Sequence, residues 1–199
     1  EKGDIVPPSI ITAIIARELL KKHKGATVLA DIRYIMTPKK IVEELGGTFV
    51  ITKVGHAFIT EKLHETGGVF AGESSAHYFF KETGNAESQL PMILTILKVM
   101  TKENKKLSSI VEGLRRSHES GEFNFSVKNA KEVMAAVKKE FPEGTVSELD
   151  GVSISFADWR LSLRSSNTEP LLRLNIEVDI NGNVEEKKER VIKVIKKHG

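Results

Sequence analysis

The 199-residue sequence contains no cysteine. Disulfide bonds, thiol catalysis and thiolate metal sites are therefore excluded, and the composition suits a reducing compartment such as the cytoplasm, where we expect the protein. Long apolar runs are also missing: none approaches the roughly 20 residues of a membrane span, and no secretory signal opens the chain. We therefore expect no membrane partner.

A large excess of charge of one sign is absent as well. Lysine and arginine together number 30, aspartate and glutamate number 27, and the formal net charge is +3 with no concentrated basic arm. This balance gives no indication of a nucleic-acid partner. An initiating methionine is lacking too. The first four residues, E-K-G-D, read as a strand-to-turn connection cut in the middle, so we expect a fragment of a longer protein.

The apolar content is sufficient for folded domains. Apolar residues make up 40% of the chain, and its length suits one large or two small domains. Apolar residues recur with helical spacing over residues 9–22, and short apolar runs over residues 28–32, 48–54 and 68–72 are separated by further helical segments. This alternation of strand and helix predicts an α/β domain.

The periodic pattern lapses at residues 117–122, S-H-E-S-G-E, which we interpret as an interdomain linker. The α/β domain then covers residues 1–117. Residues 123–199 show strand-like segments, a helix capped by Asn129, and a closing helix. We predict a smaller α+β domain here, with three or four antiparallel strands backed by two helices.

One stretch of the second domain, R-S-S-N-T-E-P-L-L-R at residues 164–173, lies between two segments whose apolar residues alternate with period two, as in half-buried strands. The connection at residues 165–170 exceeds the about 2–5 residues of a usual hairpin loop and has no glycine. Its guanidinium, hydroxyl and amide donors suit a phosphate and come from Arg164, Ser165, Ser166, Asn167 and Thr168. An ordinary polar loop, whose side chains satisfy local backbone groups, explains the same pattern.

Glu169 is the one acidic residue of this stretch. A carboxylate repels a phosphate at close range, so Glu169 does not suit direct contact with such a ligand. We expect it to pair with Arg173 or to orient Arg164.

A second polar motif, G-E-S-S-A-H at residues 72–77, follows a predicted strand. If the backbone stays extended, Glu73, Ser75 and His77 point to one side. An acceptor, a hydroxyl and an imidazole suit neighbouring sugar hydroxyls better than a metal with only two plausible ligands. A hydrolase is a weaker interpretation, because the motif is not a Gly-x-Ser-x-Gly elbow and neighbours on one face do not define a triad.

Two further candidates follow the ends of predicted strands. His56 follows the strand at residues 48–54, and Arg33 follows the strand at residues 28–32. Ligands bind at the carboxyl ends of strands in α/β sheets. A histidine at a helix start is nevertheless more often a surface or capping residue, and an exposed arginine at a strand end requires no ligand.

Taken together, the motifs at residues 72–77 and 164–170, with K-V-G-H at residues 53–56 ahead of both, resemble the α-D-phosphohexomutases, the phosphomannomutase and phosphoglucomutase family. The resemblance covers nearly the whole chain, in the order and spacing of the family's third and fourth domains. It implies domain three over residues 1–117, with the tail of domain two at its start, and domain four over residues 123–199.

The resemblance also implies an activity. Family members are four-domain enzymes that move a phosphoryl group between the C1 and C6 hydroxyls of a hexose, through a hexose 1,6-bisphosphate. They use a phosphoserine in domain one and Mg²⁺ held by a run of aspartates in domain two. This sequence has no Thr-Ala-Ser-His-Asn-Pro context and no Asp-x-Asp-x-Asp run. The implied partners are therefore a phosphosugar and the missing N-terminal domains of the same protein, which would hold the Mg²⁺.

Individual positions take their implied roles from the matching motifs. The resemblance assigns Glu73, Ser75 and His77 to the sugar hydroxyls. It places His56 and Arg33 beside the reacting hydroxyl as candidates for the catalytic step, with His56 transferring a proton or stabilising charge. The non-transferred phosphate is assigned to Arg164, Ser166, Asn167 and Thr168.

Two departures from the family pattern bear on substrate choice. Ala76 occupies a position where the family commonly has glycine, and G-N-A-E at residues 84–87 replaces a usual acidic pair. Phosphoglucosamine mutase, or another sugar-phosphate mutase of the same fold, is therefore an alternative. For an isolated fragment, a phosphosugar-binding module without turnover is another.

Overall fold

The computed structural model describes residues 1, 3–166, 169 and 171–199. The chain divides into two compact units, Glu1–Arg116 and Ser117–Gly199, called unit 1 and unit 2 below. None of the helices in the described part of the chain is long and apolar enough to cross a membrane.

Unit 1 is a mixed α/β layer structure around a five-stranded sheet of order β2-β1-β3-β4-β5. Strands β2, β1 and β3 are parallel, whereas β4 and β5 are antiparallel additions. The elements in chain order are α1 (Pro8–Lys22), β1 (Thr27–Asp31), α2 (Met36–Glu44), β2 (Thr48–Thr52), α3 (His56–Thr66), β3 (Phe70–Gly72), β4 (Tyr78–Phe80), a 3₁₀ turn (Lys81–Thr83), β5 (Ala86–Glu87), α4 (Gln89–Glu103) and α5 (Leu107–Leu114).

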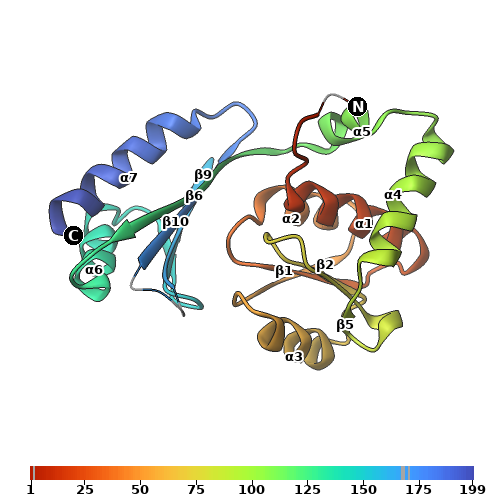
Figure 1. Cartoon of the computed structure of the whole chain (residues 1–199), viewed down its shortest axis with the longest axis horizontal. Helices are drawn as coiled ribbons and strands as arrows, with labels where there is room; N and C mark the ends of the chain where they lie inside the picture. The colour runs from red at the N-terminus through yellow and green to blue at the C-terminus, as the bar shows by residue number, and fades with distance from the viewer. Residues whose placement is uncertain (2, 167–168, 170) are drawn as a thin grey trace. The chain divides into compact units, whose positions relative to one another are not determined.

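Helices cover both faces of this sheet, which is why β1 and β3 have consecutive buried residues instead of an alternating pattern. Helices α1 and α2 lie on one face and α3 lies on the other (Figure 1). Val28 of β1 packs in the core cluster with α1, and the next residue, Leu29, packs with Ile59 and Leu63 of α3. The carboxyl ends of the three parallel strands are left free for polar side chains.

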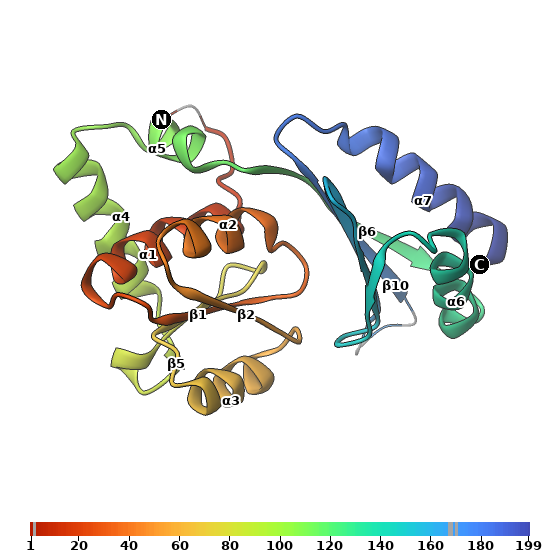
Figure 2. The same ribbon diagram turned by 180° about the vertical axis from the view of Figure 1, so that it is seen from behind.

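Unit 2 is an antiparallel five-stranded sheet of order β6-β10-β9-β8-β7. Helices α6 and α7 lie on the same side of the sheet, as Figure 2 shows. The N-cap of α6 forms as predicted, because Asn129 accepts hydrogen bonds from the backbone N–H groups of Lys131 and Glu132. The elements are β6 (Ser117–Ser126), α6 (Ala130–Glu140), β7 (Thr145–Ser147), β8 (Val152–Ser155), β9 (Trp159–Ser165), β10 (Leu171–Asp179) and α7 (Val184–His198).

The period-two alternation of β9 and β10 separates two environments. Apolar residues such as Leu161 and Leu174 pack in the cluster that includes α6 and α7. The residues between them are polar and, in β9, equally buried, and Arg160 of β9 pairs with Glu177 of β10 at 3.1 Å. Polar side chains on this second face therefore depend on one another for charge compensation.

Two sequence-based expectations for unit 2 are wrong. Residues 117–122 are not a linker but the first half of β6, paired with β10 from Ser117 opposite Asp179 onward. These residues lack the regular alternation of a strand because β6 contains a bulge near Gly121, where φ is +78° and the register shifts. The sheet also has five strands, not three or four: β6 pairs with β10 at one edge, and β7 pairs with β8 at the other.

We expect Gly151→Ala to destabilise unit 2 by about 2–5 kcal/mol. Gly151 has φ of +72°, and a Cβ there would lie 2.4 Å from the carbonyl oxygen of Leu163 and 2.8 Å from the Cα of Arg164. The left-handed backbone costs about 1–2 kcal/mol for a residue with a side chain, and the overlap with the β9 backbone adds about 1–3 kcal/mol. Urea unfolding followed by the fluorescence of Trp159, the single tryptophan of the chain, measures this loss.

Gly121→Ala is the matched control for this prediction. Gly121 has a similar φ of +78°, but a Cβ there meets nothing within 4 Å. Its substitution should cost only the backbone contribution of about 1–2 kcal/mol. Equal destabilisation by the two variants would contradict the role assigned to the contact with β9.

Candidate functional site

Polar side chains gather where the parallel strands of unit 1 end. Strand β1 lies between β2 and β3, and the connections to them, α2 and α3, lie on opposite faces of the sheet. In folds with such a reversal, ligands bind at the carboxyl ends of the strands. Arg33 follows β1, His56 begins α3 after β2, and Glu73 follows β3. The strand order therefore brings three of the predicted site residues to one edge.

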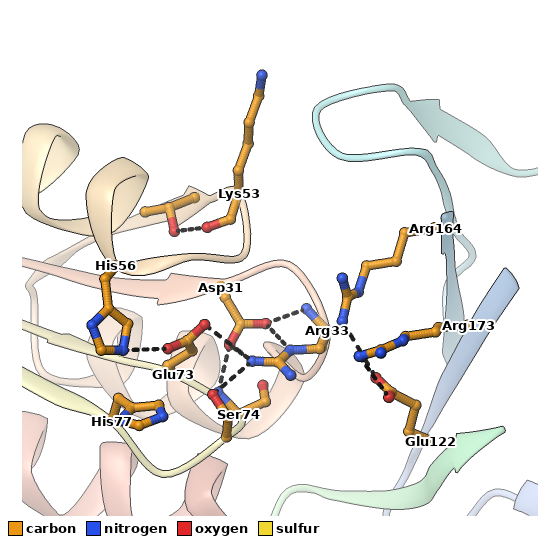
Figure 3. Close-up of polar contacts among 12 residues, drawn as sticks. Asp31, Arg33, Lys53, His56, Glu73, Ser74, His77, Glu122, Arg164 and Arg173 are labelled. Atoms are coloured by element: carbon orange, nitrogen blue, oxygen red, sulfur yellow. Dashed lines mark hydrogen bonds and ion pairs between the residues drawn. The ribbon is translucent and has the colours of Figure 1, made fainter. Parts of the chain in front are cut away.

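Asp31, the last residue of β1, anchors this edge. Its side chain is completely buried. Oδ1 accepts hydrogen bonds from the backbone N–H of Arg33 at 2.8 Å and from its Nε at 2.9 Å, and Oδ2 accepts from Arg33 Nη2 at 3.2 Å and from the backbone N–H of Ser74 (Figure 3). One carboxylate thus connects the end of β1 to the loop after β3. Asp31 was not predicted as a site residue, although an acidic residue at the end of an apolar strand is a signal that could have identified it.

Arg33 is held inside the site and is not an exposed arginine at a strand end, since only 8% of its surface is accessible. Nη2 donates a hydrogen bond to Oγ of Ser75 at 3.1 Å and lies 3.4 Å from Oε1 of Glu73. With Asp31 holding the other side of the guanidinium, the position of Arg33 is set by two carboxylates. Arg33 in turn positions Ser75 and Glu73.

Residues 73–77 form a tight connection between the antiparallel strands β3 and β4, so the expectation of an extended segment is wrong. The backbone N–H of Glu73 donates to the carbonyl of His77 at 2.8 Å, and the N–H of Ala76 donates to the carbonyl of Glu73 at 2.9 Å. The turn forces Ala76 to a φ of +67°, a conformation that favours glycine. Strand pairing of residues 70–72 with 78–80 overrides the extended alternative.

The side chains of the turn have different partners. Ser75 contacts Arg33, whereas His77 Nδ1 lies 2.9 Å from Oε1 of Glu87 at the end of β5. This hydrogen bond from the imidazole holds the pKa of the Glu87 carboxyl below its ordinary value, and the amide of Gln89 acts in the same direction. Glu87 is a second site residue that sequence analysis missed, because it lies ten positions from His77.

His56 faces this cluster from the first turn of α3. Its Nε2 lies 3.9 Å from Oε2 of Glu73 and 3.6 Å from Oε2 of Glu87, and its ring contacts the edge of the His77 ring with centroids 4.6 Å apart. The side chain of His56 is 53% exposed, whereas that of Glu73 is 4% exposed. An accessible imidazole therefore lies over a buried carboxylate.

The predicted phosphate-binding stretch, residues 164–173, lies at the end of the β9–β10 hairpin in unit 2. Arg164 and Arg173 stand directly opposite each other in the register of these strands. Two like charges at this spacing repel. Glu122 of β6 compensates them: Oε2 lies 3.5 Å from Arg164 Nη2, and Oε1 lies 3.4 Å from Arg173 Nη1. The hairpin thus holds two guanidinium groups that share the carboxylate of Glu122.

The start of the connecting loop belongs to the same network. Arg173 Nη2 donates to Oγ of Ser166 at 3.1 Å and pairs with Oε2 of Glu169 at 3.3 Å, which confirms the expected pairing of Glu169 with Arg173. Asn167 and Thr168 lie outside the described residues. Arg173 and Glu122 were not predicted as site residues; the position of Arg173 opposite Arg164 in the alternating pattern is the signal that could have found Arg173.

These arrangements differ in the ligands they suit. The edge of unit 1 offers carboxylate acceptors, a hydroxyl, a guanidinium and two imidazoles, a mixture that matches a polyhydroxylated molecule. The two arginines of unit 2 present planar forks suited to an oxyanion such as phosphate. Among the described residues, His56, Glu73 and His77 are the one group of at least three whose ligand atoms are close enough for a metal. Two of the three are nitrogen ligands, which Mg²⁺ does not favour, so these residues do not fit that ion.

Known protein families match both units. The model of phosphoglucomutase/phosphomannomutase, alpha/beta/alpha domain III, matches residues 7–117. The model of phosphoglucomutase/phosphomannomutase, C-terminal domain, matches residues 122–194. Together they account for almost the entire chain.

Individual proteins agree with the family models. A phosphomannomutase of Methanocaldococcus jannaschii is 42% identical over 197 residues, which is 99% of this chain and 44% of that protein. A phosphomannomutase of Vibrio cholerae is 37% identical over 202 residues, again 99% of this chain and 44% of that protein. The crystal structure of a phosphoglucomutase/phosphomannomutase family protein from Burkholderia thailandensis superposes with a TM-score of 0.81 at 26% identity, over 98% of this chain and 43% of that one. The chain thus spans less than half the length of these relatives.

Proposed function

The chain belongs to the phosphoglucomutase/phosphomannomutase family, and we propose that it is the part of a phosphohexomutase that binds the sugar hydroxyls and the phosphate that is not transferred. The observation that carries this proposal is the pair of arginines, Arg164 and Arg173, held side by side at a loop rich in hydroxyl donors. Glu73, Ser75 and His77, at the strand ends of unit 1, would bind the sugar hydroxyls.

The phosphate is proposed to bind at the end of the β9–β10 hairpin. Hydrogen bonds to a charged group contribute roughly 1.5–3 kcal/mol each, so two guanidinium groups and the Ser166 hydroxyl provide enough for weak binding. Glu169 occupies one fork of Arg173 and is 57% exposed, so it can move away when an oxyanion replaces it. Asn167 and Thr168 remain predicted contributors from the family motif.

The sugar is proposed to bind at the edge of unit 1. A hydroxyl group both donates and accepts, and Glu73, Ser75 and His77 together offer both capacities. Glu73 Oε2 is buried and accepts no hydrogen bond from any residue that the structure describes, so a ligand hydroxyl would satisfy it. Arg33 would hold Glu73 and Ser75 in position for this contact, because its Nη2 contacts both side chains.

In the reaction we propose, a phosphoryl group moves between C1 and C6 of a hexose through a hexose 1,6-bisphosphate, with the phosphoserine and the Mg²⁺ ligands supplied by N-terminal domains of the same protein. His56 transfers the proton of the reacting hydroxyl or stabilises charge there, because its accessible imidazole stands at the carboxyl end of the sheet. Mg²⁺ held by those N-terminal domains would supply charge stabilisation to the reaction. A preference for hexosamine phosphate is the alternative within the same fold.

We expect the 199-residue chain to bind a hexose phosphate at about millimolar concentration without turning it over.

Three variants test the two proposed binding sites. Arg164→Ala should abolish binding of both hexose phosphate and inorganic phosphate, because it removes one of the two guanidinium groups. Glu73→Ala should weaken only the hexose phosphate, since its partner is a hydroxyl, and Glu169→Gln should tighten both by removing a competing carboxylate. NMR titration with a chelator present measures all three.

Several outcomes would count against the proposal. Unchanged binding by Arg164→Ala would remove the phosphate site from the hairpin. Equal losses of sugar phosphate and inorganic phosphate in Glu73→Ala would place that residue elsewhere. Interconversion of 1-phosphate and 6-phosphate sugars by the purified chain would show that the reactive groups lie within it.

A further inference from the structure

Two histidines and a glutamate converge in unit 1 although they come from different elements. His56 begins α3, Glu73 follows β3, and His77 precedes β4. One nitrogen of each ring and one carboxylate oxygen of Glu73 lie within 4.8 Å of one another. The close-up in Figure 3 shows His56 and Glu73 turned toward each other, with His77 beside them.

The state of Glu73 is an independent sign that this cluster accepts a ligand. Its side chain is 4% exposed, and Oε2 accepts no hydrogen bond from any residue that the structure describes. His56 Nε2 lies 3.9 Å from this oxygen, which is beyond hydrogen-bonding distance. A buried carboxylate oxygen without a donor is unfavourable, and a cation bound between Glu73 and the imidazoles would relieve it.

Glu87 adds a feature typical of metal centres. Its Oε1 lies 2.9 Å from Nδ1 of His77, and the side-chain amide of Gln89 donates to the same oxygen at 3.1 Å. A carboxylate bonded to one ring nitrogen fixes the tautomer and orientation of a metal-ligating histidine. The other oxygen of Glu87 lies 3.6 Å from His56 Nε2, so Glu87 lies against both rings.

We propose that His56, Glu73 and His77 form a binding site for one transition-metal ion of the zinc type, with Glu87 orienting His77. Two imidazoles and a carboxylate are a donor set that Zn²⁺ accepts, whereas Mg²⁺ and Ca²⁺ require oxygen ligands. Zinc–ligand bonds of about 2.0–2.2 Å place tetrahedral ligand atoms about 3.3–3.6 Å apart, so distances within the cluster must shorten by up to about 1.5 Å. The half-exposed side chain of His56 has the freedom to make that movement.

The site has a consequence for the proposed sugar binding. Glu73 and His77 are assigned to sugar hydroxyls above, so zinc and hexose phosphate should exclude each other. This consequence, unlike the metal site itself, rests on the proposed function. Zinc would then act as a competitive inhibitor with respect to the sugar.

Calorimetric titration of the full 199-residue chain with zinc chloride tests the site. We expect one ion per chain, no binding of magnesium under the same conditions, and loss of zinc binding in both His77→Ala and Glu73→Gln. Glu87→Gln should weaken zinc about 10- to 100-fold without abolishing it, as expected for a group that orients a ligand. His64→Ala is the matched control, because His64 is an exposed histidine of the same helix as His56, and it should bind zinc like the unaltered chain.

The possible results separate the metal site from the sugar site. Absence of zinc binding, zinc binding that survives both ligand variants, or zinc binding lost in His64→Ala overturns the metal site. The folded state of each variant is checked by the amide NMR spectrum, so an unfolded variant is replaced by His56→Gln. If zinc binds as expected but hexose phosphate does not compete with it, the metal site stands and the sugar assignment of Glu73 fails.

Discussion

Asp31→Asn should lower the free energy of unfolding of unit 1 by about 3–5 kcal/mol, the usual effect of removing one partner from a buried charge pair. The Asp31 carboxylate is completely buried and accepts from Arg33 and from the backbone of Ser74. An amide of the same shape keeps one acceptor but turns a donor toward groups that are themselves donors. Amide hydrogen exchange measures the loss, and protection should fall in β1 and β3 while β9 and β10 keep theirs.

Glu44→Gln is the control for this variant. Glu44 accepts from both Arg116 Nε and Nη2 at 3.1 Å, but half of its side chain is exposed. Exposed ion pairs contribute about 0–1 kcal/mol, so this substitution in the same unit should have a small effect. If Asp31→Asn is no more destabilising than Glu44→Gln, Asp31 is not the anchor of the strand-end site.

His56→Ala should lower kcat about 10²- to 10⁴-fold and leave KM nearly unchanged, when tested in a protein that also carries the N-terminal domains. A proton-transfer group acts mainly in the transition state, so its loss affects the rate more than substrate binding. The accessible imidazole at the start of α3 has the exposure that such contact with a substrate requires. Steady-state kinetics with a hexose phosphate, measured across pH, checks both constants.

His64→Ala again supplies the control, since it removes an exposed imidazole from the same helix without touching the site cluster. Its kinetics should match those of the unaltered enzyme. A rise in KM alone for His56→Ala would reassign His56 to substrate binding. A loss of the pH dependence together with the fall in kcat would support proton transfer.

Local patterns predicted most of the elements, because helix and strand periodicity depend on neighbouring residues. The apolar spacing over residues 9–22 corresponds to α1, and the alternation on either side of the phosphate-binding loop corresponds to β9 and β10. The Asn129 cap and the pairing of Glu169 with Arg173 were also predictable, since both join residues at most four positions apart. The motifs at residues 72–77 and 164–170 were enough to indicate the family.

Contacts between distant residues followed from strand order and could not be read from periodicity. The crossover through α3 places β3 beside β1, and this alone brings the Ser74 backbone to Asp31, 43 positions away, and Arg33 to Ser75, 42 positions away. Residues 117–122 became a strand because β10 offered a partner more than 50 residues later. Hydrogen bonds and ion pairs between remote segments depend on which strands are neighbours. Only the tertiary structure could therefore reveal the contact of Asp31 with Ser74, that of His56 with Glu87 and that of Glu122 with Arg164.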